Sequence, residues 1–117
     1  MTKRDYKAEF DNQLAQSSIA PPLKELMFAK SIGRKWRFDY AWVDELLAVE
    51  YEGIYAGKSR HLTVQGFTED CIKYDTAVIL GWRVLRVTAP MVDSGRALVF
   101  VRQALGLEDL VVEEELL

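Results

Sequence analysis

Hydrophobic and polar residues alternate with a period of two in two neighbouring segments, residues 35–42 and 46–52. In the first segment every second residue is aromatic: Trp36, Phe38, Tyr40 and Trp42. In the second segment every second residue is aliphatic or aromatic: Leu47, Val49 and Tyr51. Such alternation is typical of strands with one packed face. A short loop at residues 43–45 predicts that the two strands pair as an antiparallel hairpin.

One register of this hairpin brings the apolar side chains together. It pairs Trp42 with Leu47, Tyr40 with Val49, and Phe38 with Tyr51. The same register pairs Ala41 with Ala48, Asp39 with Glu50, and Arg37 with Glu52. A slip of one residue would send the apolar side chains to the acidic face, so the pattern strongly favours this register.

The register therefore predicts that Asp39 and Glu50 are neighbours on one polar face of the sheet. Ala41 and Ala48 beside them are small and would leave room for an ion and a ligand. An ordinary amphipathic hairpin with solvated acids also explains the alternation. It does not explain why two acids should stand directly opposite each other, because that pairing normally costs stability.

The rest of the chain predicts four helices and one further strand. The first helix, residues 4–15, has Tyr6, Phe10 and Leu14 at helical spacing. The second helix is expected at residues 22–31, because proline stands early in it and Gly33 just past its end, and it would carry Glu25 on its flank. The remaining elements are a helix at 67–80, a strand at 82–88 and a helix from 93 or 94 to 105.

The helix at residues 67–80 connects two strands. Its expected apolar side consists of Phe67, Cys71, Tyr74 and Val78. This places Lys73 on the side away from that stripe. A strand, helix and strand in succession imply a right-handed crossover with parallel pairing. The predicted fold class is therefore α/β or α+β, with a small mixed β-sheet flanked by helices.

Length and composition narrow the class of protein. A chain of 117 residues that is 50% hydrophobic predicts a single domain over residues 1–117. No membrane partner is expected, because the sequence shows neither a spanning apolar run nor a secretory signal pattern. The single cysteine, Cys71, has no partner for a disulfide or a zinc cluster, which favours a reducing compartment.

The net charge of −3 at first argues against a nucleic-acid partner. However, an acidic C-terminal tail at residues 111–117 contains three glutamates, and without them the formal charge is zero. Acids gathered in the hairpin would repel one another unless a cation lies between them. A divalent metal is the economical explanation, and metal-bound carboxylates beside a basic loop suggest phosphodiester chemistry.

The basic loop spans residues 54–66 and includes Lys58, Arg60 and His61. Lys58 and Arg60 are expected to contact phosphates, because a glycine-bearing loop lets the protein backbone approach that of a nucleic acid. His61 is a candidate for substrate contact. A lone histidine is also compatible with a structural or surface role.

The order of these features resembles the PD-(D/E)XK nuclease superfamily. The resemblance covers roughly residues 22–101. It rests first on three acidic positions: Glu25, Asp39 within the run Trp36-Arg37-Phe38-Asp39-Tyr40-Ala41-Trp42, and the pair Glu50-x-Glu52. It rests also on the segment that begins at Asp70 and leads to Gly81-Trp82-Arg83-Val84-Leu85-Arg86. The chain is most similar to small stand-alone endonucleases related to very-short-patch repair endonucleases. Many of those are encoded by phages and prophages. The resemblance implies a restriction-endonuclease-like core and, for a phage protein, the cytoplasm of a bacterial host cell.

The resemblance also implies roles for individual residues. Asp39 and Glu50 would bind the metal, with the backbone carbonyl of Tyr51 as a further oxygen ligand. Mg²⁺ suits such ligands, and Mn²⁺ is expected to substitute for it. The metal would polarise the scissile phosphate and lower the pKa of an attacking water. Glu25 would act at the far edge of the site, through water or behind the ligands, although a solvated helix residue is an equal interpretation.

The sequence departs from the family motif at Glu52, where a lysine is usual. Either the cationic role has moved to another element or the site is impaired. Lys73 is the leading replacement, because related small members often carry a basic residue in that helix. As an alternative to Lys73, Glu52 itself would recruit a second metal or pair with Arg37 across the strands. Of two further arginines, Arg83 and Arg86, one is expected to approach the site, and the sequence does not decide which.

Together these features predict a Mg²⁺-dependent deoxyribonuclease, an endonuclease selective for the structure of repair or recombination intermediates. DNA is the expected partner. One alternative is an impaired nuclease-fold module that binds nucleic acid or a protein without turnover, and another is a small structural domain whose acids are incidental. A domain of this size cuts one strand per site, so a double-strand cut requires a homodimer or two visits.

Overall fold

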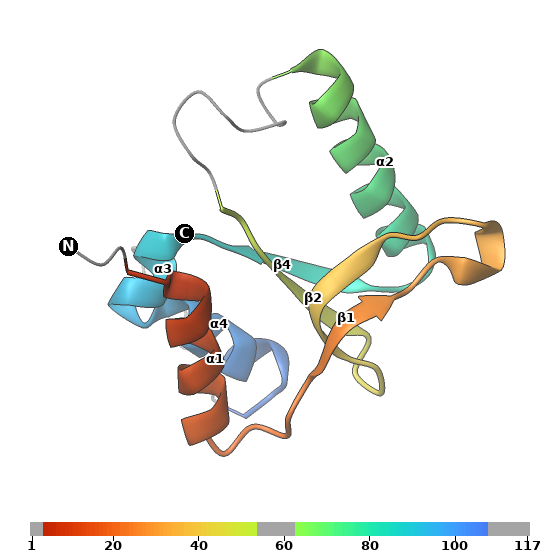
Figure 1. Ribbon diagram of the computed structural model, residues 1–117. Helices are drawn as coiled ribbons and strands as arrows, with labels where there is room; N and C mark the ends of the chain where they lie inside the picture. Colours follow the sequence, from red (N-terminus) through yellow and green to blue (C-terminus); the bar gives the residue numbers. More distant parts are fainter. Residues whose placement is uncertain (1–3, 54–62, 108–117) are drawn as a thin grey trace, which may run out of the picture.

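A computed structural model describes residues 4–53 and 63–107 of the chain. Four strands form one sheet in the order β1-β2-β3-β4: β1 (Leu23–Met27), β2 (Arg37–Trp42), β3 (Leu47–Tyr51) and β4 (Arg83–Val87). β1, β2 and β3 form an antiparallel meander, and β4 runs parallel to β3 (Figure 1). The helical elements are α1 (Tyr6–Gln16), η1 (Lys30–Ile32), α2 (Val64–Ile79), α3 (Ala89–Ser94) and α4 (Arg96–Ala104). The predicted α+β class, a small mixed sheet flanked by helices, is confirmed.

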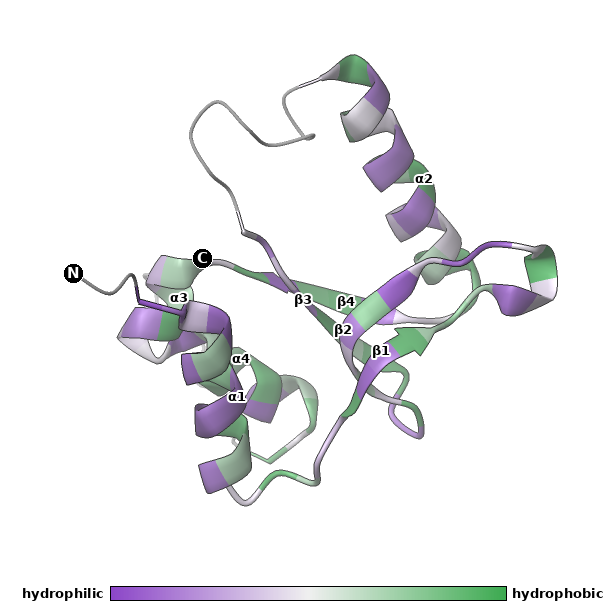
Figure 2. Ribbon diagram, in the orientation of Figure 1, coloured by the Kyte–Doolittle hydropathy of each residue, from purple (hydrophilic) through white to green (hydrophobic). Residues whose placement is uncertain are grey.

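Helices cover both faces of the sheet. One face packs against α1, α3 and α4 around Phe10, Tyr40 and Val49, and this larger core also includes Trp42, Leu47, Val87 and Val101. The other face packs against α2 in a smaller cluster of Phe38, Ala41, Ala48, Ala77 and Trp82. In Figure 2 the strands β3 and β4 are largely hydrophobic where they pass between these two layers. No helix in the described part of the chain is long and apolar enough to cross a membrane.

The hairpin register agrees with the prediction in the three pairs next to the connecting loop. The observed pairs are Tyr40 with Val49, Ala41 with Ala48, and Trp42 with Leu47. Ala41 and Ala48 were predicted on an open polar face, but both are buried beneath α2. Their small side chains let the helix pack closely on the sheet instead of leaving room for a ligand.

The helix predicted at residues 22–31 is wrong, because this segment forms β1 and the short turn η1. Leu23 pairs with Ala41, and Leu26 pairs with Phe38, along the open edge of β2. An edge strand satisfies backbone groups of β2 that a helix would leave without partners. Gly33, expected to end an α-helix, ends η1 in the left-handed conformation with φ 78°.

Glu25 therefore lies on a strand, and its backbone is unusual. Its φ of 56° is uncommon for a residue other than glycine. The β1–β2 ladder pairs Lys24 with Tyr40 and Leu26 with Phe38 but does not include Glu25 and Asp39 between them. At this interruption the side chains of β2 stop alternating regularly between the two faces of the sheet.

The two aromatic residues on either side of the interruption lie on opposite faces of the sheet. The Tyr40 hydroxyl donates to Asp11 of α1. The Phe38 ring stacks on Phe28 at 3.9 Å between centroids and packs beneath α2 against Trp82 at 5.0 Å. The predicted common face for Phe38 and Tyr40 is therefore wrong, because the strand does not alternate regularly through Asp39.

The inner face of α2 differs from the prediction at every predicted residue except Tyr74. Phe67 and Val78 are 58% and 66% exposed, and Cys71 is exposed as well. The side facing the sheet carries the buried Ala77 and the half-buried Lys73 and Tyr74, together with Gly66. Ala77 packs in the cluster between the helix and the sheet, and polar contacts from Lys73 and Tyr74 hold the preceding turn to β3 and to Glu52.

The last predicted helix is present as α4, and a separate short helix that was not predicted, α3, precedes it. α3 ends at Gly95, which has a φ of 84°, and α4 begins directly after it. The parallel crossover from β3 through α2 to β4 is as predicted. As a result, the ends of β2, β3 and β4 that carry the candidate site lie between α1 and α2.

Phe10→Ala is expected to lower the free energy of unfolding by about 3–5 kcal/mol, because it removes a fully buried ring that meets Tyr40 edge to face at 5.3 Å. Phe67→Ala is the matched control and should change stability by less than about 0.5 kcal/mol, since that ring faces solvent. Urea denaturation followed by circular dichroism measures both. A large loss in the Phe67 variant would contradict the observed orientation of α2.

Candidate functional site

Two carboxylates meet where β2 and β3 separate. Beyond the pair of Tyr40 and Val49 the ladder stops, and acidic side chains accept the backbone hydrogen bonds. Glu50 Oε2 accepts from the N–H of Asp39 at 2.9 Å, and Asp39 Oδ2 accepts from the N–H of Tyr51 at 2.7 Å. Because strand N–H groups lie near the plane of the sheet, both carboxylates are drawn into the opening between the strands. The two acids were predicted on a polar face of the sheet, and they are observed in the opening between the two strands.

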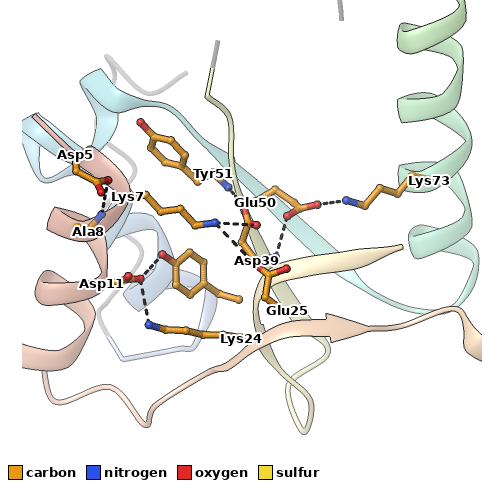
Figure 3. A network of polar contacts seen from close by, with 11 residues as sticks. Asp5, Lys7, Ala8, Asp11, Lys24, Glu25, Asp39, Glu50, Tyr51 and Lys73 are labelled. Carbon is orange, nitrogen blue, oxygen red and sulfur yellow. Dashed lines mark hydrogen bonds and ion pairs between the residues drawn. The ribbon is translucent and has the colours of Figure 1, made fainter. Parts of the chain in front are cut away.

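Two lysines reach the acids from opposite layers. Lys7 of α1 donates to Asp39 Oδ1 at 3.3 Å. Lys73 of α2 donates to Glu50 Oε1. Figure 3 shows the two ammonium groups on either side of the acid pair. The helices that cover the two faces of the sheet are thus both connected to the same pair of carboxylates.

Glu50 is the most deeply placed charge of the site. It is 5% exposed, and burial raises its pKa above the ordinary value. The negative charge of Asp39 acts in the same direction, while Lys73 and the N–H of Asp39 oppose the shift. The Lys73 side chain is itself only 18% exposed. The ionised form of Glu50 therefore depends strongly on Lys73.

Lys7 connects the acid pair to Glu25. Burial acts to lower the pKa of Lys7, but the charges of Asp39, Glu25 and Asp11 together raise it above its usual value. Its Nζ lies 3.3 Å from Asp39 Oδ1 and 3.9 Å from Glu25 Oε1. Glu25 is therefore at the edge of the site, as expected, although it reaches that position from a strand. The sequence pattern gives no signal for Lys7 as a site residue beyond its place next to Tyr6 of the apolar stripe of α1.

A second cluster lies beside the acid pair, around Glu52. Glu52 Oε1 accepts from Arg86 Nε at 2.7 Å and from the Tyr74 hydroxyl at 3.1 Å. The Arg86 guanidinium also lies 4.6 Å from the centroid of the Tyr74 ring. Glu52 thus reaches across to β4 and α2, where the hairpin pattern predicted Arg37 on β2 as its partner. Tyr74, expected in the core, is a polar contact of this cluster.

The structure also decides between the two arginines of β4. Arg86 is the register partner of Glu50, and its side chain contacts Glu52. Arg83 donates instead to the backbone carbonyls of Ala104 at 3.0 Å and Glu45 at 3.1 Å. Arg86 is therefore the arginine that approaches the site.

The donor set agrees with the chemistry of Mg²⁺. Asp39, Glu50 and the carbonyl of Tyr51 offer oxygen only, and Mg²⁺ is commonly held by one or two carboxylates with water and substrate phosphate. The described residues contain no group of three or more His, Cys, Asp or Glu side chains arranged to hold a metal ion. The side chains that would bind Mg²⁺ are therefore the two carboxylates of Asp39 and Glu50. A cation there competes with the contacts from Lys7 and Lys73.

An open cleft of about 1000 Å³ lies next to Lys7 and Glu52, and neither Asp39 nor Glu50 lines it. Its walls are the start of α1, the end of β3 and the start of α3, and Lys7 and Tyr51 line it. Because Lys7 also contacts Asp39, it connects the cleft to the acid pair. Lys58, Arg60 and His61, the predicted nucleic-acid contacts, fall outside the described residues, as does the acidic tail at 111–117.

Comparisons with known proteins assign no family to the chain. No protein-family model, no curated protein and no solved structure matches it.

Proposed function

We propose that this protein is a Mg²⁺-dependent deoxyribonuclease related to the PD-(D/E)XK superfamily. The observation that carries the proposal is the contact of Lys73 with Glu50, beside Asp39. The sequence lacks the usual motif lysine and has Glu52 in its place. A lysine from α2 at the acid pair supplies the missing combination of two acids and a cation.

The order of the elements supports the same proposal. A helix, three antiparallel strands, a helix and a parallel strand follow one another along the chain. The acids lie on β2 and β3, and Lys73 lies on the crossover helix. This agrees with the succession of acids, helix and strand on which the resemblance to the nuclease superfamily rests.

The proposed chemistry divides the work among these residues. Mg²⁺ held by Asp39 and Glu50 would polarise the scissile phosphate and lower the pKa of the attacking water. Lys73 provides positive charge that stabilises the charge developing on the phosphate. Lys7 orients Asp39 and lines the cleft through which the DNA strand reaches the acids.

A binding module without turnover is the second candidate. The observation that favours it is that a lysine and a backbone N–H already satisfy each carboxylate. Acids neutralised in this way do not require a metal for the fold. Such a protein would hold DNA in the cleft without cutting it.

A panel of labelled DNAs tests the proposal: single strand, duplex, nicked duplex, flap and four-way junction, each with Mg²⁺, Mn²⁺ or EDTA. We expect cleavage of at least one substrate with either metal and none in EDTA. Binding without cleavage under every condition would support the binding module. Absence of both binding and cleavage would contradict both candidates.

A further inference from the structure

Glu52, Tyr74 and Arg86 form a polar cluster beside the acid pair. We infer that Arg86 binds a DNA phosphate next to the bond that is cut, and that Glu52 and Tyr74 position its guanidinium for this purpose. The inference rests on the proposed function and adds the residue that holds the substrate backbone. It also gives Glu52, the departure from the family motif, a role other than metal binding.

The first support is the anchoring of the guanidinium. The Glu52 side chain is only 10% exposed, and its Oε1 accepts from both Arg86 Nε and the Tyr74 hydroxyl. Burial and the charges of Glu50 and Glu52 raise the pKa of Tyr74, so its hydroxyl remains a donor. The Tyr74 ring, 4.6 Å from the guanidinium carbon, restricts the guanidinium further. Such pre-organisation lowers the entropy cost of binding a ligand.

The second support is that the contact with Glu52 engages only the Nε side of the Arg86 guanidinium. Glu52 occupies Nε, and within residues 4–53 and 63–107 the structure shows no hydrogen bond from the terminal nitrogens of Arg86. The Arg86 side chain is 49% exposed. A guanidinium presents its donors as a planar fork that matches two phosphate oxygens. The anchored group therefore has donors available to a phosphate in solvent.

The third support is the place of Arg86 relative to the acids. Arg86 stands opposite Glu50 in the β3–β4 register, one strand from the acid pair. Lys73 and Tyr74 are consecutive residues of α2, so one helical turn contacts both Glu50 and Glu52. Lys73 is the buried cation at the acids, and Arg86 is the more exposed cation beside it. This separation favours a role for Arg86 in holding the bound substrate.

Arg83 provides an internal comparison on the same strand. Both of its terminal nitrogens donate to backbone carbonyls, those of Ala104 and Glu45. Its guanidinium is thus used within the fold, at the end of β4 away from Glu52. A phosphate role is therefore specific to Arg86, and Arg83→Gln is the matched control.

The test is the affinity of Arg86→Gln for fluorescein-labelled duplex and four-way junction, with Ca²⁺ replacing Mg²⁺ to prevent cleavage. Glutamine keeps a donor for Glu52 and removes the charge. We expect about a tenfold loss of affinity and a salt slope reduced by about one, as for the loss of a phosphate contact. Arg83→Gln should retain the affinity and slope of the wild type. Arg86→Lys, which keeps the charge without the fork, should be intermediate.

Glu52→Gln tests the positioning role. It should raise KM with little change in kcat, and it should have little further effect in the Arg86→Gln background, because both changes act through one contact. Circular dichroism confirms that each variant is folded. Wild-type affinity and slope in folded Arg86→Gln and Arg86→Lys would overturn the inference while leaving the nuclease proposal intact. A wild-type protein that neither binds nor cleaves DNA would overturn both.

Discussion

Lys73→Met is expected to lower single-turnover cleavage about a hundred- to a thousandfold while DNA affinity stays nearly unchanged. Loss of one preorganised group that stabilises transition-state charge has an effect of this size. The ammonium contacts Glu50 and is largely buried, so it is poorly placed for a ground-state contact with DNA. Without Lys73, burial and Asp39 would also favour the protonated form of Glu50.

The measurement compares cleavage at saturating enzyme with binding in Ca²⁺. Lys24→Met is the matched control, because Lys24 also pairs with a carboxylate, Asp11, at 3.5 Å but lies on β1. It should cleave at the wild-type rate. If Lys73→Met retains full turnover, the cation of the reaction comes from another residue or from a second metal ion.

Asp39→Asn and Glu50→Gln are each expected to reduce cleavage about a thousandfold and to weaken Mn²⁺ binding. A metal ion contributes several kcal/mol of transition-state stabilisation, and each 1.36 kcal/mol corresponds to a factor of ten in rate. The fold should persist, because each amide oxygen still accepts the backbone hydrogen bond that the carboxylate accepts from Tyr51 or Asp39. Isothermal titration calorimetry with Mn²⁺ measures binding independently of turnover.

Asp75→Asn is the control for these two variants, since Asp75 is an exposed acid of α2. It should change neither Mn²⁺ affinity nor cleavage. Unchanged metal affinity in both acid variants would exclude Asp39 and Glu50 as the metal site. Loss of folding in either variant would indicate that the carboxylate is needed for the structure itself.

The hairpin shows how much of the site was predictable. Alternation with a period of two allowed one good register, and Tyr40, Ala41 and Trp42 have the predicted partners. Asp39 and Glu50 follow from the same register as neighbours. The prediction failed where regular alternation ends at Asp39, because the irregular backbone of Glu25 on the adjacent strand has no signal in the hairpin sequence.

The segments around the hairpin were less predictable. Leu23, Leu26 and Met27 fit a helix as well as a short strand, and the open edge of β2 decides for the strand. Of the residues predicted on the inner face of α2, Tyr74 faces the sheet, whereas Phe67, Cys71 and Val78 are exposed. Lys73, predicted on the outer side, also turns toward the sheet, and Glu50 and Glu52 accept hydrogen bonds from Lys73 and Tyr74 there.

The amino-acid sequence by itself determined the order of most strands and helices, the hairpin register next to the loop, and the acid pair of Asp39 and Glu50. These features depend on residues close together in the chain. Only the tertiary structure decided which cations meet the acids. Lys7 and Asp39 are 32 residues apart, Lys73 and Glu50 are 23 apart, and Arg86 and Glu52 are 34 apart. Such contacts depend on how the helices and β4 pack on the sheet, which no local pattern specifies.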